Sequence, residues 1–340
     1  MTQTPPWHPV RFADRLPRLR RRGLMRAAIR AFFEARGYLE VETPILVPTP
    51  GEEVHLAAFR TEWAGPCGGT AARWLHTSPE FAMKRLLVAG AGPIFQLARV
   101  FRNEQQSRTH SPEFTMLEWY RPGATLTDLM DETEALLRAV LPPVWEYNGA
   151  WLDVTRPAER VTMQHAFLTH AGVDLLACGE DAAALSGASG MPLLPDEGWE
   201  SLFFRLLLAR VEPHLGRTGG ASFLTHWPAA QAALARRAPE DQRVAERFEL
   251  FLGGMELANA FIELTAEAEQ RRRFTDDRAR RHALTGRADW PLDEDFLAAL
   301  RFGMPAAGGV ALGFDRLVML ASGATRIEEV QYLPPGAGPD

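Results

Sequence analysis

The spacing of apolar residues along the chain predicts a mixture of helices and strands. Apolar side chains recur at helical spacing over 24–33, and Gly37 supplies a stop signal. The segment 38–44 alternates like a strand and ends at a proline, and 93–104 and 113–120 are also predicted strands. Because these strands are separated by long irregular pieces without regular βαβ alternation, we expect an α+β fold, an antiparallel sheet flanked by helices.

The second half of the chain continues this alternation. A capping-box pattern at 125–128 opens a predicted helix that runs through Val140. Residues 145–195 are rich in Ala, Gly and Pro with weak periodicity, which indicates a variable insertion. An apolar helical pattern follows and should stop near Pro213. The last third is expected to return to strands and to finish with one strand-to-helix unit at 309–321.

Composition narrows the class of protein. Apolar residues make up 46% and charged residues 24% of the 340 residues, as in soluble globular proteins with a large core. No apolar run approaches the roughly 18 residues that a membrane span needs. The net charge of −6 does not support a large nucleic-acid contact, and the basic run 18–22 is interpreted as a solvated helix start. Cys67 and Cys178 form no disulfide framework, so a cytoplasmic location is expected.

The first group of candidate residues follows two of the predicted strands. The strand period places Gln96, Arg102 and Glu104 on one face of the first strand. On the second strand, Phe114, Glu118 and Tyr120 share a face with Met116. A hairpin of these strands would bring a cation, carboxylates, an aromatic ring and a phenol to one surface, which is unusual for a purely structural sheet.

A second group surrounds a predicted hairpin. Gly253 and Gly254 between apolar flanks are a two-residue turn signal. The resulting register opposes Glu249 to Ala258 and places Glu249 and Glu256 diagonally on one face, roughly 7–8 Å apart. Two carboxylates at that separation favour a Mg²⁺ ion held jointly with phosphates, and two solvated surface glutamates are the alternative.

A third group is the glycine-rich segment 308–313, which precedes Arg316 at a predicted helix N-terminus. Small residues allow a ligand to approach the backbone closely, and a helix N-terminus favours anions. The segment matches neither the phosphate loop of P-loop enzymes nor the dinucleotide fingerprint.

Together these segments resemble the class II aminoacyl-tRNA synthetases over residues 18–333. Motif one corresponds to Pro44 after a long helix, motif two to 101–104 with 113–114, and motif three to 311–316. The lysine branch is indicated by the segments 77–80, 114–118 and 256–259. The short form that modifies elongation factor P is indicated by the segments 83–90 and 244–249. The resemblance implies one class II catalytic domain over residues 1–340.

The resemblance also implies formation of an aminoacyl-adenylate from an amino acid and ATP. Catalysis of this reaction is mostly positioning and charge stabilisation, here by Arg102 at the α-phosphate and by Arg316, with His110, at the γ-phosphate. Glu249 and Glu256 would bind Mg²⁺. The remaining implied ATP-binding residues are Asn103, Glu104 at the adenine edge, Ser111, Phe114 under the adenine ring, Leu257, Asn259 and Gly313.

For the amino acid, Tyr120 and Glu263 resemble the pair that binds the ε-ammonium of lysine, and Glu80 resembles the acid that receives the other amino group. Ser78, Pro79 and Ala311 complete the implied set of substrate-binding residues. Because tRNA-charging relatives typically have glycine where Ala311 stands, the extra methyl group favours (R)-β-lysine over α-lysine.

The acceptor and the assembly are also implied by resemblance. Barely 20 residues precede the first predicted helix, so we expect no anticodon recognition, and we expect transfer to a lysine of elongation factor P. A homodimer is expected by analogy with class II domains. Two alternatives stay open: an amino-acid-activating enzyme with another acceptor, such as ammonia or a carrier, and a non-catalytic synthetase-like amino-acid sensor.

Three positions depart from the family pattern. Ser111 stands in place of an asparagine, Ala260 in place of a glycine, and Ile262 in place of a polar residue. Strict alternation would put Glu256 and Glu263 on opposite faces, so we expect a bend or bulge between them. The family's glycine would make such a bend easy, whereas alanine at position 260 resists a positive φ.

Overall fold

The computed structural model describes residues 5–65, 68–104, 106–217, 219–286 and 290–335. The chain forms two compact units, one of residues 1–124 and 265–340 and one of residues 125–264. Each unit combines helices with a mainly antiparallel group of strands, which confirms the predicted α+β class. Among the described helices, none is long and apolar enough to cross a membrane.

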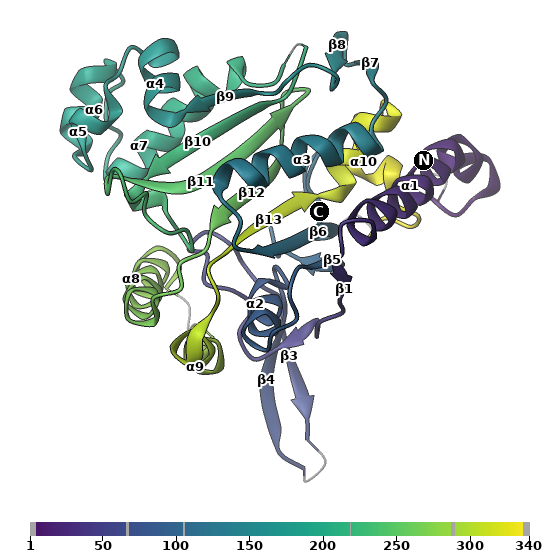
Figure 1. Cartoon of the computed structure of the whole chain (residues 1–340), viewed down its shortest axis with the longest axis horizontal. Helices are drawn as coiled ribbons and strands as arrows, with labels where there is room; N and C mark the ends of the chain where they lie inside the picture. The colour runs from purple at the N-terminus through teal and green to yellow at the C-terminus, as the bar shows by residue number, and fades with distance from the viewer. Residues whose placement is uncertain (1–4, 66–67, 105, 218, 287–289, 336–340) are drawn as a thin grey trace. The chain divides into compact units, whose positions relative to one another are not determined.

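The first unit has a group of four adjacent strands in the order β1-β5-β6-β13 (Figure 1). They are β1 Leu39–Glu40, β5 Ile94–Phe101, β6 Glu113–Pro122 and β13 Ala307–Gly313. β1 is parallel to β5, and the other pairs are antiparallel. A small sheet of β2 Leu46–Val47, β4 Thr70–Leu75 and β3 Arg60–Ala64 ends in a hairpin that projects from this unit (Figure 1).

Two of the predicted strand boundaries were wrong. The strand predicted over 93–104 ends at Phe101, so Arg102 and Glu104 lie beyond it and do not share a strand face with Gln96. The strand predicted over 38–44 has only the two residues of β1, and one further backbone hydrogen bond follows, from the Val41 amide to the Phe95 carbonyl.

Helices cover both faces of β6. They are α1 Pro9–Glu34, α2 Glu80–Val88 and α10 Phe314–Ser322, and a 3₁₀ turn follows at Ile327–Val330. On one face, the Arg22 guanidinium of α1 donates to Asp315 of α10 at 2.8 Å and to the Thr115 hydroxyl at 2.8 Å. The opposite face of β6, which carries Glu118 and Tyr120, meets α2.

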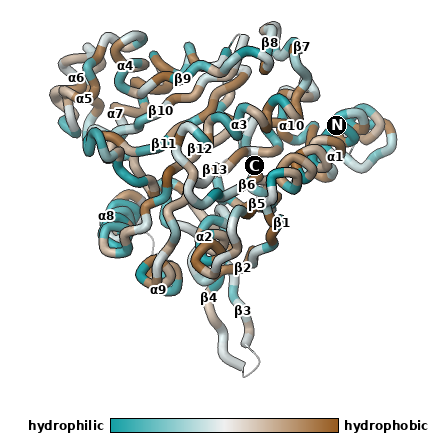
Figure 2. The backbone as a smooth tube through the Cα atoms, viewed as in Figure 1, coloured by the Kyte–Doolittle hydropathy of each residue, from teal (hydrophilic) through white to brown (hydrophobic). Residues whose placement is uncertain are grey.

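Three helices of this unit were not predicted: α2, α8 Glu267–Thr285 and α9 Glu294–Gly303. Among the positions of α8 whose burial is described, the buried ones are Gln270, Phe274 and Arg281; only Phe274 is apolar, so no amphipathic pattern appears. Figure 2 shows α8 as a largely hydrophilic helix. Its surface instead carries ion pairs between residues four apart, such as that between Arg271 and Glu267. By contrast, the sequence contained a start signal for α9, because Asp293 is an N-cap residue whose side chain accepts from the Phe296 amide.

The second unit has four adjacent strands in the order β12-β11-β10-β9. They are β9 Glu159–Thr162, β10 Ser222–Pro228, β11 Val244–Leu252 and β12 Met255–Ile262, and only the β9–β10 pair is parallel. The predicted capping box at Thr125 and Asp128 is confirmed and opens α3 Leu126–Val140.

The segment predicted as a variable insertion folds into short elements. They are the hairpin of β7 Val144–Tyr147 and β8 Ala150–Asp153, then β9, α4 Met163–Ala171, α5 Leu175–Cys178 and α6 Ala182–Ser189. These helices share one core with α7 Trp199–Leu206, which continues as a π-helix at Leu207–Val211 and a 3₁₀ turn at Glu212–His214. The predicted stop near Pro213 is therefore confirmed. A 3₁₀ turn at Ala229–Gln231 follows β10. Cys178 is a free thiol, and Cys67 lies outside the described residues.

Candidate functional site

In the first unit, an arginine and an aromatic ring meet where β5 ends and β6 begins. The Arg102 guanidinium lies over the Phe114 ring, 5.3 Å from its centroid. The Arg102 amide also donates to the Pro112 carbonyl at 2.9 Å, which continues the pairing of the two strands beyond their formal ends. A flat, half-buried ring beside a fixed cation offers a stacking surface next to an anion-binding group.

A second cation lies close to the loop between β5 and β6. Arg316, in the first turn of α10, donates to Nε2 of His110 at 2.8 Å. Nδ1 of the same ring lies 2.7 Å from the Ser107 hydroxyl, so a neutral imidazole carries its proton on Nδ1 and accepts from Arg316. The predicted association of Arg316 with His110 is present, and it holds a guanidinium near a helix N-terminus, where anions are favoured.

The other predicted nucleotide residues of this unit are placed as follows. Asn103 and Glu104 are exposed, and the Asn103 amide donates to the Ala57 carbonyl at 2.8 Å. Ser111 is buried, and its hydroxyl makes no hydrogen bond to another described residue. Gly313 caps α10 with an ordinary negative φ of −69°, so its small size, and not a special backbone conformation, distinguishes this position.

The amino-acid residues of the first unit form a connected polar cluster. The Ser78 hydroxyl donates to Oε1 of Glu118 at 2.5 Å, and the Tyr120 hydroxyl donates to Oε2 at 3.2 Å. The Ser78 hydroxyl also accepts from the Glu80 amide at 3.0 Å, while Pro79 caps α2. This arrangement therefore joins three of the predicted residues, Ser78, Glu80 and Tyr120, through a fourth carboxyl group.

That fourth group, Glu118, was among the candidate residues of this strand, but no substrate-binding role was predicted for it. It is completely buried, and this burial, with the nearby charge of Glu80, raises the pKa of Glu118 to about 8. A carboxyl group that is neutral at neutral pH becomes a strong acceptor when an ammonium group arrives beside it. The available signal was its position between Met116 and Tyr120, on the face already singled out.

Ala311 of β13 lies directly beside this carboxyl group. It is the cross-strand partner of Glu118, whose partner on the other side is Gln96 of β5. Paired residues of neighbouring strands project to the same face, so the methyl group of Ala311 narrows the space next to Glu118.

In the second unit, the predicted hairpin is present with a different register. Gly253 and Gly254 form its turn with φ values of 63° and 72°. Leu252 pairs with Met255 and Phe251 with Glu256, as predicted, but Glu249 pairs with Asn259 and not with Ala258. The register shifts at Leu257, which is a β-bulge.

The bulge decides which side chains share a face. Beyond it, Asn259 and Glu263 return to the face of Glu249 and Glu256, because one extra residue reverses the alternation. The predicted bend or bulge between Glu256 and Glu263 is thus confirmed. Ala260 has no positive φ and is buried on the opposite face with Ile262, so neither departure from the family pattern strains the backbone.

The carboxylates of this face are close enough to interact. Burial and the charge of Glu256 raise the pKa of Glu249, while Arg247 opposes the shift. The Arg247 guanidinium donates to Glu249 at 2.5 Å, an ion pair that was not predicted. Two carboxylates with the amide oxygen of Asn259, which makes no hydrogen bond to another described residue, fit a hard cation with oxygen ligands.

Glu263 is buried and lies just beyond β12, where it bridges to Ala235. Its predicted partner, Tyr120, belongs to the first unit and is bound to Glu118 there. The pairing of Tyr120 with Glu263 therefore stays a prediction.

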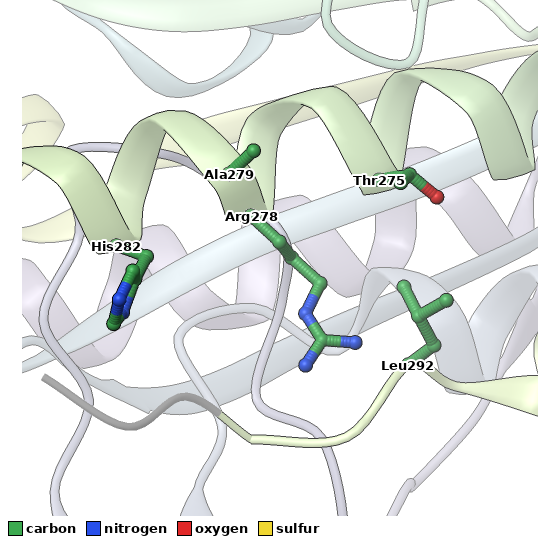
Figure 3. A pocket seen from close by; sticks show the side chains of 5 residues that line it. All are labelled: Thr275, Arg278, Ala279, His282 and Leu292. Carbon is green, nitrogen blue, oxygen red and sulfur yellow. The ribbon is translucent and has the colours of Figure 1, made fainter.

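A groove of about 330 Å³ lies beside α8, apart from the predicted site residues (Figure 3). Its lining consists of Thr275, Arg278, Ala279, His282 and Leu292, and it includes no predicted site residue.

Comparison with known proteins assigns the chain to a family. The family model for class II tRNA synthetases (D, K and N) matches residues 10–336. The chain belongs to this family, as the order of its three motifs predicted. The match runs through both compact units.

Within the family, the chain is similar to proteins named elongation factor P–(R)-β-lysine ligase. The protein of Salmonella typhi is 44% identical over 335 residues, covering 97% of this chain and 98% of the relative. The protein of Klebsiella pneumoniae strain 342 has the same identity and coverage. The resemblance to this short form of the lysine branch is thereby confirmed.

Proposed function

We propose that this protein is an ATP-dependent ligase that activates lysine or (R)-β-lysine as the aminoacyl-adenylate and transfers it to a lysine of elongation factor P. The observation that carries the proposal is the polar cluster of Ser78, Glu80, Glu118 and Tyr120. Two carboxyl groups and a phenol suit an amino acid with two ammonium groups. The names of the similar proteins support the acceptor.

The nucleotide roles are those that the family resemblance implies, and the contacts of Arg102 and Arg316 support them. Phe114 would stack under the adenine ring, with Glu104 at its edge and Asn103 and Ser111 nearby. Arg102 beside this ring would hold the α-phosphate and the attacking carboxylate, and its positive charge would be most useful as negative charge develops. Arg316, held by His110, would bind the terminal phosphate, and Gly313 would allow the nucleotide to lie against the backbone.

Mg²⁺ would be held by Glu249 and Glu256, with Asn259 and the bulged Leu257 on the same stretch of strand. When bound, the ion supplies charge neutralisation of the phosphates. By the family resemblance, Glu263 would bind the ε-ammonium group of the amino acid. We further propose that both units work as one catalytic domain, because a single family model spans them. We propose that the protein acts in the cytoplasm.

Amino-acid-dependent exchange of pyrophosphate into ATP tests the proposal. We expect exchange with (R)-β-lysine to exceed exchange with (S)-β-lysine and α-lysine. Incubation with elongation factor P should then add one lysyl mass to that protein, and a variant lacking the acceptor lysine should stay unmodified. A preference for α-lysine would redirect the search to another acceptor. Absence of exchange with all three, in folded protein with Mg²⁺, would favour a non-catalytic sensor.

A further inference from the structure

A buried lysine belongs to the amino-acid cluster and has no role in the function proposed above. Lys84 lies one turn after Glu80 on α2, and it is 1% exposed. Its Nζ atom donates to Oε1 of Glu80 at 2.5 Å and lies 6.0 Å from the centroid of the Tyr120 ring. A lysine is almost never this deeply buried unless its charge is compensated.

The charges of the cluster explain what this ammonium group can do. The groups that face Glu118 within the first unit are Glu80 and Lys84 from α2, Tyr120 from the same strand, and the hydroxyl of Ser78. The cross-strand neighbours Gln96 and Ala311 do not titrate. With Glu118 protonated, Lys84 balances Glu80 and the empty cluster is neutral. A substrate ammonium group can then be matched by ionisation of Glu118.

We propose that Lys84 is a specificity-determining positioning residue: a built-in ammonium group that orients the Glu80 carboxylate, offsets its charge, and leaves Glu118 with Tyr120 to accept an amino group of the substrate. This inference rests on the proposed function and adds to it a residue that contacts the acids and not the reacting atoms. Lys84 donates to Oε1 of Glu80, and Oε2 of the same carboxylate would accept from the amino acid.

The first experiment replaces the ammonium group and then restores it. Lys84→Ala removes three carbons and the nitrogen, the size of n-propylammonium. We expect the KM for the amino acid to rise about 10- to 100-fold, the range for loss of a charge-assisted hydrogen bond, while the KM for ATP stays unchanged. Added n-propylammonium should recover part of the loss, and the neutral 1-propanol of equal size should not. Equal recovery with both compounds would overturn the proposal.

Two further variants separate charge from packing. Lys84→Met fills the same volume without charge, so it should show the raised KM and no rescue, because no cavity is left for the added amine. Wild-type behaviour of Lys84→Met would reduce Lys84 to a packing role and end the proposal. Arg85→Met removes the neighbouring cation of α2, which pairs with Asp293, and should leave the KM for the amino acid unchanged.

A measurement without turnover keeps this inference distinct from the proposed function. The infrared carboxylic-acid band of Glu118, identified by its loss in Glu118→Gln, can be titrated in the free protein. In Lys84→Ala the band should persist to higher pH than in wild type, and n-propylammonium should reverse the change. An identical titration in both proteins would refute the charge-offset role. If wild type activates none of the amino acids, the proposed function fails, but this titration still decides the role of Lys84.

Discussion

At the scale of single residues, the clearest conflict between burial and charge is at Glu118. Its carboxyl group is completely buried, and its pKa is raised from 4.5 to about 8. The folded chain therefore binds this proton more tightly than the unfolded chain does. It follows that the free energy of unfolding falls as the pH rises from about 4.5 to about 8, the window between the two values.

We therefore expect Glu118→Gln to gain stability over wild type as the pH rises through that window, by on the order of a few kcal/mol. Urea unfolding of both proteins at the two ends of the window measures the difference. Glu62→Gln, at an exposed position of β3, should show no such trend. A constant difference between Glu118→Gln and wild type would contradict the raised pKa.

Ala311 makes a second prediction at this scale, because its methyl group lies beside the same carboxyl group. Ala311→Gly should widen the space next to Glu118 and shift preference from (R)-β-lysine towards α-lysine, by roughly 10-fold, the usual effect of one methyl group in a pocket. Pyrophosphate exchange with the two amino acids measures the ratio. An unchanged ratio would remove Ala311 from the determinants of specificity.

Single residues were predictable where alternation alone decided their direction. The shared face of Phe114, Glu118 and Tyr120 followed from the strand period. The roles of Glu118 and Lys84 did not, because a pattern of residue types contains neither depth of burial nor the partner of a charge. The ion pair of Arg247 with Glu249 was not predicted for the same reason.

At the scale of elements, prediction succeeded where local chemistry was strong. The capping box of α3, the glycine turn between β11 and β12 and the apolar pattern over 24–33 of α1 each have a signal within a few residues. The predicted start of α1 was wrong, because the helix begins at Pro9, and the basic run 18–22 lies in its middle. Arg22 of that run is buried against Asp315 and is not solvated as predicted. α8 was missed because, among its positions with described burial, only Phe274 is both buried and apolar, so the helix has ion pairs along its surface and no apolar stripe.

The hairpin of β11 and β12 supplies a prediction about Ala260. The bulge at Leu257, and not a positive φ at residue 260, brings Glu256, Asn259 and Glu263 to one face. Ala260→Gly should therefore bring no functional gain and should lower the free energy of unfolding by about 0.5–1 kcal/mol, since glycine in a strand loses more conformational freedom. Denaturant unfolding together with pyrophosphate exchange measures both effects. A more active Ala260→Gly variant would show that the strand needs the flexibility of glycine.

At the scale of the whole molecule, motif order was more informative than composition. The net charge and apolar content excluded classes of protein but indicated no activity. Three motifs in one order placed the chain in its family, and the family model spans residues 10–336. The two compact units were not predicted, since the contacts that define them come from residues on both sides of the 125–264 segment.

The assembly is the last prediction and concerns the outer surface of the motif-one segment. Leu24 of α1 is 68% exposed, Leu39 of β1 is 55% exposed, and Ile45 and Leu46 follow at 40% and 43%. Exposed leucine and isoleucine at successive elements of one segment are typical of an interface, and class II domains generally pair through this helix and strand.

We expect a homodimer with twice the mass of the 37.8 kDa chain in size-exclusion chromatography with light scattering. Leu24→Asp should shift it to the monomer, because a charge would be buried, whereas Leu208→Asp, at a 59% exposed position of the second unit, should not. A wild-type protein that elutes as a monomer at all concentrations would instead make these side chains ordinary exposed apolar residues, and each chain would have to carry out the reaction alone.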